Sequence, residues 1–212
     1  MIKRYKKYFT DRDFIISASI SFVLLVVSFV INFYAGTYAT NNASNSVTDI
    51  ILSNTPVFDL DGIFVWGPVV LWFFVTLLCL HKPQKIPFIL KNIALFVLIR
   101  SVFISITHIG PFPDQIALQT GTSIAQAFTF GADLFFSAHT GLPFLMALIF
   151  YKDKLLRWIF ISSSIFFGVV VLLTHRHYSI DVLSAFFITY AIYDIGLYFF
   201  KKDYRLFNTE EI

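Results

Sequence analysis

Two short polar segments hold the residues best suited to acid–base or nucleophilic chemistry. They read DLFFSAHT at 133–140 and HRHYSID at 175–181. His177 and Asp181 are four positions apart, so at the start of a helix both lie on one face, within side-chain reach. A carboxylate bound to one ring nitrogen fixes the tautomer and makes the other nitrogen more basic, as a nucleophilic or general-base histidine requires. The alternative is a helix start with an acidic first-turn residue and interfacial histidines.

The first segment offers a proton donor beside an anion site. Ser137 is a candidate N-cap, which would leave the N–H groups of the residues after it free to bind an anion. His139 would stand beside that helix start as a proton donor, and an ordinary cap with an interfacial histidine is the alternative. Only about 22 Å of helix separates Ser137 from Tyr151. A span here is therefore either short or begins near Asp133.

Two arginines are further candidates, for substrate binding. Arg100 lies within a long apolar run, where a cation is costly unless it faces a polar cavity or an anionic partner. Snorkelling to the surface is the alternative, but the depth favours a cavity. Arg176 stands beside His177, and an interfacial position is its alternative.

Other chemistries have weaker support. Three histidines and an aspartate could converge on a metal, but their spacing matches no standard zinc motif. The chain has no P-loop, glycine-rich nucleotide fingerprint or Asp-rich magnesium motif, so ATP is not indicated as a donor. The single Cys79 excludes an intrachain disulfide. We predict no cofactor, no metal and no nucleic-acid partner.

The composition of the 212-residue chain is that of a membrane protein. Hydrophobic residues make up 57% and charged residues 14%, with a mean hydropathy of +0.74, whereas soluble domains carry about 25% charged residues. These values exclude a disordered chain, a coiled coil and a disulfide scaffold. We predict one all-α polytopic membrane domain over residues 1–212.

Apolar runs long enough to cross a bilayer predict six transmembrane helices. They cover Phe14–Ala35, Ile63–Leu80, Ile86–Ile109, roughly Ala132–Tyr151, Leu155–Leu173 and Ile180–Phe200. A cleaved signal peptide is the competing interpretation of the first run, which is longer than the 7–15 residues usual for one. Six spans place both termini on one side.

Basic residues indicate which side that is. Every Lys and Arg except Arg100 and Arg176 lies near the termini or around the second and fourth connections, and the long connections 36–62 and 110–131 have none. The positive-inside rule makes the basic face, with both termini, cytoplasmic.

The same topology brings the two polar segments together at the outer face, above Arg100. Two histidines, one held by a carboxylate, with cations and a helix start suit phosphoryl transfer. One histidine would attack phosphorus while the other protonates the leaving oxygen. A site at the leaflet boundary indicates a phospholipid substrate.

The ordered motifs resemble those of the PAP2 (type 2 phosphatidic acid phosphatase) superfamily, and its sphingomyelin synthase-related branch most closely. GADLFFSAHT (131–140) and HRHYSIDVLSAFFITY (175–190) resemble the second and third motifs of that superfamily. RSVFISITHIGPFPD (100–114) resembles the Arg-led motif of the branch, and TPVFDLDG (55–62) is similar to a Pro-and-Asp motif after the first span. The likeness covers about residues 86–200.

The resemblance implies a catalytic triad. His177 would be the nucleophile that forms a phosphohistidine, Asp181 its orienting partner and His139 the acid–base residue, with Asp133 as the acid of the second motif. Ala138 replaces the usual glycine. The Lys-x6-Arg-Pro motif of the phosphatases is missing, and Val171 stands where they place an arginine. Both absences favour the synthase-like branch.

Three functions remain open at this point. The first is transfer of a phosphoryl head group from a glycerophospholipid to a lipid alcohol, either ceramide or diacylglycerol. The second uses water as the acceptor, as in a phosphatidate phosphatase or phospholipase C-like hydrolase. The third is a non-catalytic lipid-binding membrane protein. Phospholipid and lipid alcohol in the outer leaflet are the expected partners, and the sequence is compatible with a homo-oligomer.

Overall fold

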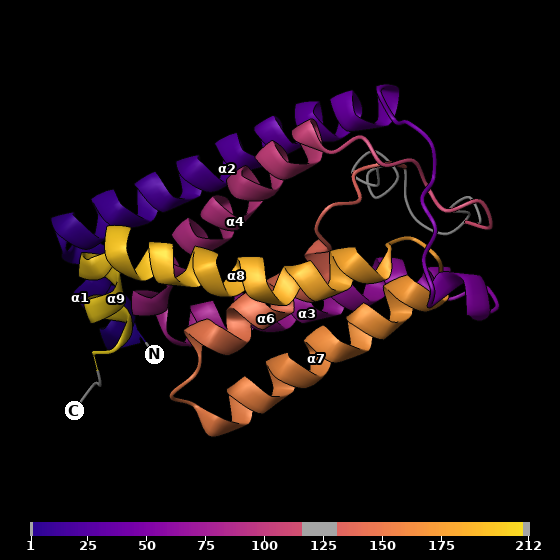
Figure 1. The fold of residues 1–212 in the computed structure, drawn as a ribbon. Coiled ribbons are helices and arrows are strands. Elements are labelled where there is room, and N and C mark those ends of the chain that lie inside the picture. Colours follow the sequence, from indigo (N-terminus) through magenta and orange to yellow (C-terminus); the bar gives the residue numbers. More distant parts are fainter. Residues whose placement is uncertain (1, 116–130, 210–212) are drawn as a thin grey trace.

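The computed structural model describes residues 2–115 and 131–209, and the secondary structure of this part of the chain is entirely helical (Figure 1). The predicted connection 110–131 lies largely outside the described residues. The elements are α1 (Ile2–Thr10), α2 (Arg12–Asn41), η1 (Leu52–Asn54), α3 (Asp61–His81), η2 (Pro83–Lys85), α4 (Ile86–Ile106), α6 (Ala138–Ile149), α7 (Lys154–Leu173), α8 (Ser179–Phe199) and α9 (Lys201–Phe207).

Five helices are long and apolar enough to cross a membrane: α2, α3, α4 with η2, α7 and α8. They confirm the all-helical class and are consistent with an integral membrane protein. The predicted fourth span is represented by α6, which begins at Ala138 rather than Ala132 and has 12 residues. At about 18 Å, α6 is shorter than the roughly 30 Å hydrocarbon core. The count of six spans is therefore not confirmed, and a short helix replaces the longer one.

Side chains of α3, α4, α6, α7 and α8, together with Phe136 before α6, form the main core. Phe88, Phe96, Phe136, Leu145 and Phe160 in this core are completely buried. Half of the apolar stretch of α4 is buried, against 17% for α2. Helix α4 is thus central, whereas α2 lies along it and exposes most of its apolar side chains (Figure 1). Such exposed apolar faces fit a hydrocarbon environment.

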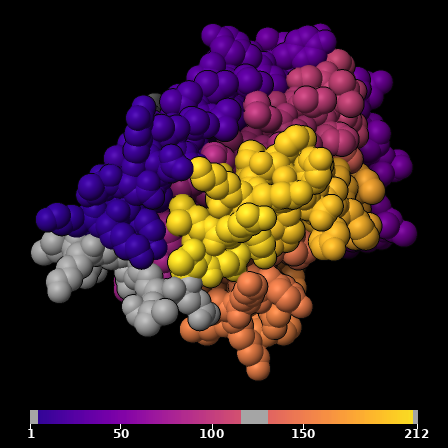
Figure 2. Space-filling view, turned by 90° about the vertical axis from the view of Figure 1, so that its left-hand side faces the viewer, coloured from indigo at the N-terminus to yellow at the C-terminus, as the bar shows by residue number. Residues whose placement is uncertain are grey.

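Helices α1 and α9 lie at the same end of the bundle (Figure 1). Figure 2 shows this end, where the start of the chain, the C-terminal segment and the α6–α7 connection gather on one surface. Tyr5 of α1 donates a hydrogen bond to the Leu80 carbonyl at the end of α3, and Lys202 of α9 pairs with Asp13 of α2. Each link joins a terminal helix to one of the long helices.

Candidate active site

The polar segment 175–181 begins in the turn between α7 and α8. The backbone N–H of His175 donates to the Leu172 carbonyl and that of Arg176 to the Val171 carbonyl, both at 3.0 Å. This pair of bonds is the Schellman arrangement that ends a helix, and His175 occupies its left-handed position with φ 53°. Glycine is the usual residue there. The turn leads within a few residues to the start of α8.

His177 and Asp181 face each other at the start of α8. Nδ1 of His177 lies 3.5 Å from Oδ2 of Asp181, and both side chains are buried. Oδ2 also accepts the backbone N–H of Tyr178 at 2.9 Å, so Asp181 caps the helix as well. Nδ1 of His177 and Oδ1 of Asp181 are buried without hydrogen-bond partners. The 3.5 Å between Nδ1 and Oδ2 is long for a hydrogen bond, and catalytic hydrogen bonds are often long in unliganded sites.

The start of α6 lies against the start of α8. The backbone N–H of Ser137 donates to the Asp181 carbonyl at 3.1 Å. Ser137 occupies the N-cap position, as predicted, but its hydroxyl makes no capping hydrogen bond and is buried without a partner. The bond between Ser137 and Asp181 holds the first turn of α6, which contains His139, against the start of α8.

His139 is oriented by α3. Its Nε2 lies 3.2 Å from the Phe64 carbonyl, and its ring stacks on the Phe64 ring with centroids 4.2 Å apart. A carbonyl can only accept, so this geometry assigns the proton to Nε2 and leaves Nδ1 as the acceptor in the neutral ring. The half-buried imidazole therefore has a defined tautomer and a defined plane.

Arg100 has an anionic partner in the segment before α6. Its guanidinium lies 3.1 Å from the Asp133 carboxylate and also donates to the carbonyls of Asp133 and Phe136. Arg100 is 5% exposed. These contacts explain why α6 starts late, because the carbonyls of Asp133 and Phe136 bind a side chain instead of helical N–H groups. Direct contact of Arg100 with a phosphate stays a prediction.

Arg176 pairs with a carboxylate that our sequence analysis did not select. Its guanidinium donates to Asp61 at the start of α3 at 2.8 Å, and lies 4.9 Å above the Phe64 ring. Phe64 thus contacts both Arg176 and His139. Two features of the sequence could have indicated this pair. Asp61 lies in the TPVFDLDG motif, and Arg176 is a basic residue outside the basic face of the bundle. Phosphate binding by Arg176 also stays a prediction.

Asp49 was missed too, and it anchors the long loop before α3 to the site. Its carboxylate accepts the backbone N–H and the hydroxyl of Ser179, both at 2.7 Å, and also the N–H groups of Ile51 and Leu52. Burial opposes ionisation, but these hydrogen bonds outweigh it and lower the pKa of Asp49 below its usual value. No sequence motif marks this residue.

Among residues 2–115 and 131–209, no group of three or more His, Cys, Asp or Glu side chains is arranged to hold a metal ion, which was the alternative interpretation of these residues. His175 faces away from the His177–Asp181 pair, with Nε2 3.1 Å from the Thr55 carbonyl and its ring against Phe112. His175 therefore belongs to the loop packing.

Residues 131–198 match a family model described as PAP2 superfamily C-terminal. The match supports membership of the PAP2 superfamily. It includes α6, α7 and α8, and with them every site residue discussed above except Arg100, Asp49, Asp61 and Phe64. No curated protein and no solved structure gave a significant match. Members of the PAP2 superfamily are phosphatases and phosphotransferases that act on lipids.

Proposed function

We propose that the protein is a membrane lipid phosphotransferase. It would move a phosphoryl head group from a glycerophospholipid to a lipid alcohol, ceramide or diacylglycerol, as sphingomyelin synthase does. The observation that carries this proposal is the meeting of two helix starts, one bearing His177 and Asp181 and the other His139. The active site would lie on the non-cytoplasmic face, opposite the basic end of the bundle.

The reaction divides into two displacements. In the first, the nucleophilic nitrogen of His177 bonds to phosphorus as the phosphorus–oxygen bond to diacylglycerol breaks, and protonated His139 gives its proton to the leaving oxygen. In the second, His139 takes the proton of the acceptor hydroxyl as that oxygen attacks phosphorus and releases His177. Asp181 stabilises the positive charge on the His177 ring.

The start of α6 supports the same reaction. The first N–H groups of a helix have no intrahelical partner and bear partial positive charge, which favours phosphate oxygens. His139 occupies this first turn. The donor of the leaving-group proton and the donors for the phosphate oxygens would then come from a single helix start.

A lipid-transfer assay tests the proposal. Purified protein in detergent–lipid micelles receives labelled phosphatidylcholine, phosphatidylethanolamine or phosphatidic acid, each with ceramide, with diacylglycerol, or with no added acceptor. His177→Ala is compared with His108→Ala, a matched histidine whose Nε2 contacts the Ser105 carbonyl outside the triad.

We expect the labelled head group to appear on the added acceptor, which for diacylglycerol carries acyl chains different from those of the donor. This product should vanish in His177→Ala and persist in His108→Ala. Release of diacylglycerol without an added acceptor would show that the protein hydrolyses the lipid instead of transferring its head group. If neither wild type nor His177→Ala changes any lipid, the catalytic proposal fails and the lipid-binding alternative gains support.

A further inference from the structure

A second polar pocket lies at the end of the bundle opposite the candidate active site. Helix α6 runs from the site at Ser137 to this pocket at Ile149 and Phe150. The pocket has a volume of about 470 Å³, within the range of small-molecule sites. Its lining comes from the α3–α4 connection, from the end of α6 and the α6–α7 connection, and from the end of α9 and the chain after it: Lys82, Gln84, Lys85, Ile149, Phe150, Lys152, Asp153, Phe207, Asn208 and Thr209.

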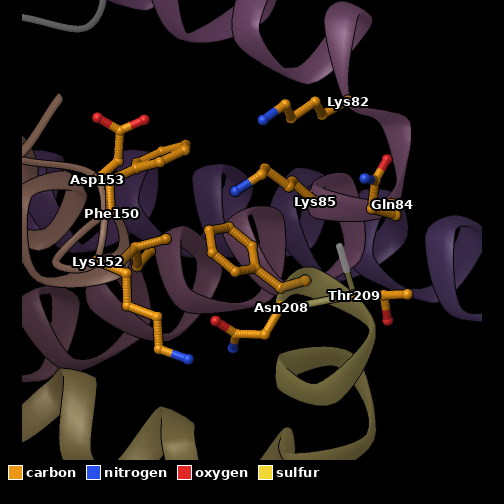
Figure 3. A pocket seen from close by; sticks show the side chains of 10 residues that line it. Lys82, Gln84, Lys85, Phe150, Lys152, Asp153, Asn208 and Thr209 are labelled. Atoms are coloured by element: carbon orange, nitrogen blue, oxygen red, sulfur yellow. The ribbon is translucent and has the colours of Figure 1, made fainter. Parts of the chain in front are cut away.

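Lysines dominate the charge of this pocket. In Figure 3, Lys82 and Lys85 extend from the α3–α4 connection and Lys152 comes from the α6–α7 connection. Asp153 is the one carboxylate in the lining, and its Oδ1 accepts the Leu156 N–H as the N-cap of α7. Within the described parts of the chain, none of these lysines has a carboxylate within 4.0 Å. The described lining of the pocket therefore carries more lysines than carboxylates.

Lys85 occupies the most desolvated position of the three. It is half-buried, and its Nζ lies 3.8 Å from the Phe207 ring centroid and 5.0 Å from that of Phe150. The rings attract the ammonium group but accept no strong hydrogen bonds. Gln84 beside it is 3% exposed, and its Oε1 is buried without a partner. An incoming group rich in acceptor oxygens would satisfy the ammonium better than the rings do.

We propose that this pocket binds a phosphate-bearing anion. Phosphate oxygens match the donors of Lys82, Lys85 and Lys152, while Phe150 and Phe207 supply an apolar floor for an attached glycerol unit. Basic pockets at the cytoplasmic ends of membrane helices bind anionic head groups in this way. The phosphate comes either from an anionic phospholipid of the adjacent leaflet or from a free phosphate ester. The site is distinct from the His139–His177 centre and does not depend on the proposed transferase activity.

The test uses the full chain in nanodiscs. One arm contains phosphatidylcholine discs with added phosphatidylglycerol, and retained lipid is counted by native mass spectrometry. The other arm contains phosphatidylcholine alone and is titrated with glycerol phosphate. The pocket variant is Lys82→Gln/Lys152→Gln. Its charge-matched control is Lys154→Gln/Lys201→Gln, two exposed lysines outside the pocket lining.

Each lysine near an anionic group is worth roughly fivefold in affinity, so the pocket variant should bind about 25-fold more weakly. The control and His177→Ala should bind as wild type does. If the pocket variant loses binding of phosphatidylglycerol alone, the ligand is a lipid head group. If it loses binding of glycerol phosphate, the ligand is a free phosphate ester. Lys85→Gln provides an independent single change should the double variant fail to fold. Equal binding by wild type, pocket variants and control, or no binding by wild type in either arm, overturns the proposal.

Discussion

The Arg100–Asp133 pair should control both the stability of the bundle and the shape of the site. Arg100→Met removes the partner of the Asp133 carboxylate and the donor to two carbonyls. Removing one member of a buried ion pair costs about 3–5 kcal/mol, because the remaining charge stays desolvated. We expect a loss of that size in the free energy of unfolding, measured by denaturant titration in micelles.

Asp133→Asn should cost less than Arg100→Met. The guanidinium keeps its two carbonyl acceptors in that variant, and a hydrogen bond to a charged group is worth about 1.5–3 kcal/mol. In the double variant no charge remains unpaired, so the combined loss should fall short of the sum by about 1–3 kcal/mol. Additive losses, or an Arg100→Met protein within about 0.5 kcal/mol of wild type, would refute a structural ion pair here.

Three further predictions concern the loops and the core. Asp49→Asn weakens the capping of α8 at Ser179 and should cost about 1 kcal/mol at neutral pH. Because the pKa of Asp49 is lowered in the folded protein, this stabilisation is present above pH ~4 and disappears as pH falls through the folded pKa, which thermal melts across pH would reveal. His175→Val should be less stable than His175→Asn by about 1–2 kcal/mol, since both lose the imidazole but only Asn tolerates φ 53°; equal melting temperatures would contradict this. Gly196→Ala places a methyl group 2.0 Å from Oδ1 of Asn92 and should cost about 1–3 kcal/mol, and Asn92→Ala should relieve much of that cost in a double variant.

The sequence predicted the long helices well because their signal is hydrophobic length, which a bilayer demands directly. It failed at the start of α6, where the apolar residues Leu134, Phe135 and Phe136 look like part of a span. Arg100 binds the backbone carbonyls of Asp133 and Phe136, and a side chain that competes for carbonyls leaves no trace in hydropathy. The start of α6 at Ala138 could therefore be read only from the structure.

For the candidate site, too, the sequence indicated some residues and not others. His139, His177 and Asp181 are candidates that residue type and spacing select, and in the structure the starts of their helices lie together. Asp49, Asp61 and Phe64 were not found, because each acts through a partner far away in the sequence. Asp61 becomes meaningful only beside Arg176, and Phe64 only beside His139. Pairings of this kind depend on the tertiary packing.

Contacts between carboxylates and residues far away in the sequence recur throughout the candidate site. Three carboxylates link the segments around the candidate triad to helices. Asp133 pairs with Arg100 of α4, Asp61 of α3 pairs with Arg176, and Asp49 binds Ser179 of α8. Burying these charges is tolerable only because each finds a matched partner. The arrangement fixes loop backbones that apolar packing alone would leave loose. Phosphoryl transfer gains most from such fixed positioning, since a displacement of about 1 Å can cost a hundredfold in rate. Changes at these carboxylates should therefore lower both turnover and stability, whereas His177→Ala should lower turnover alone.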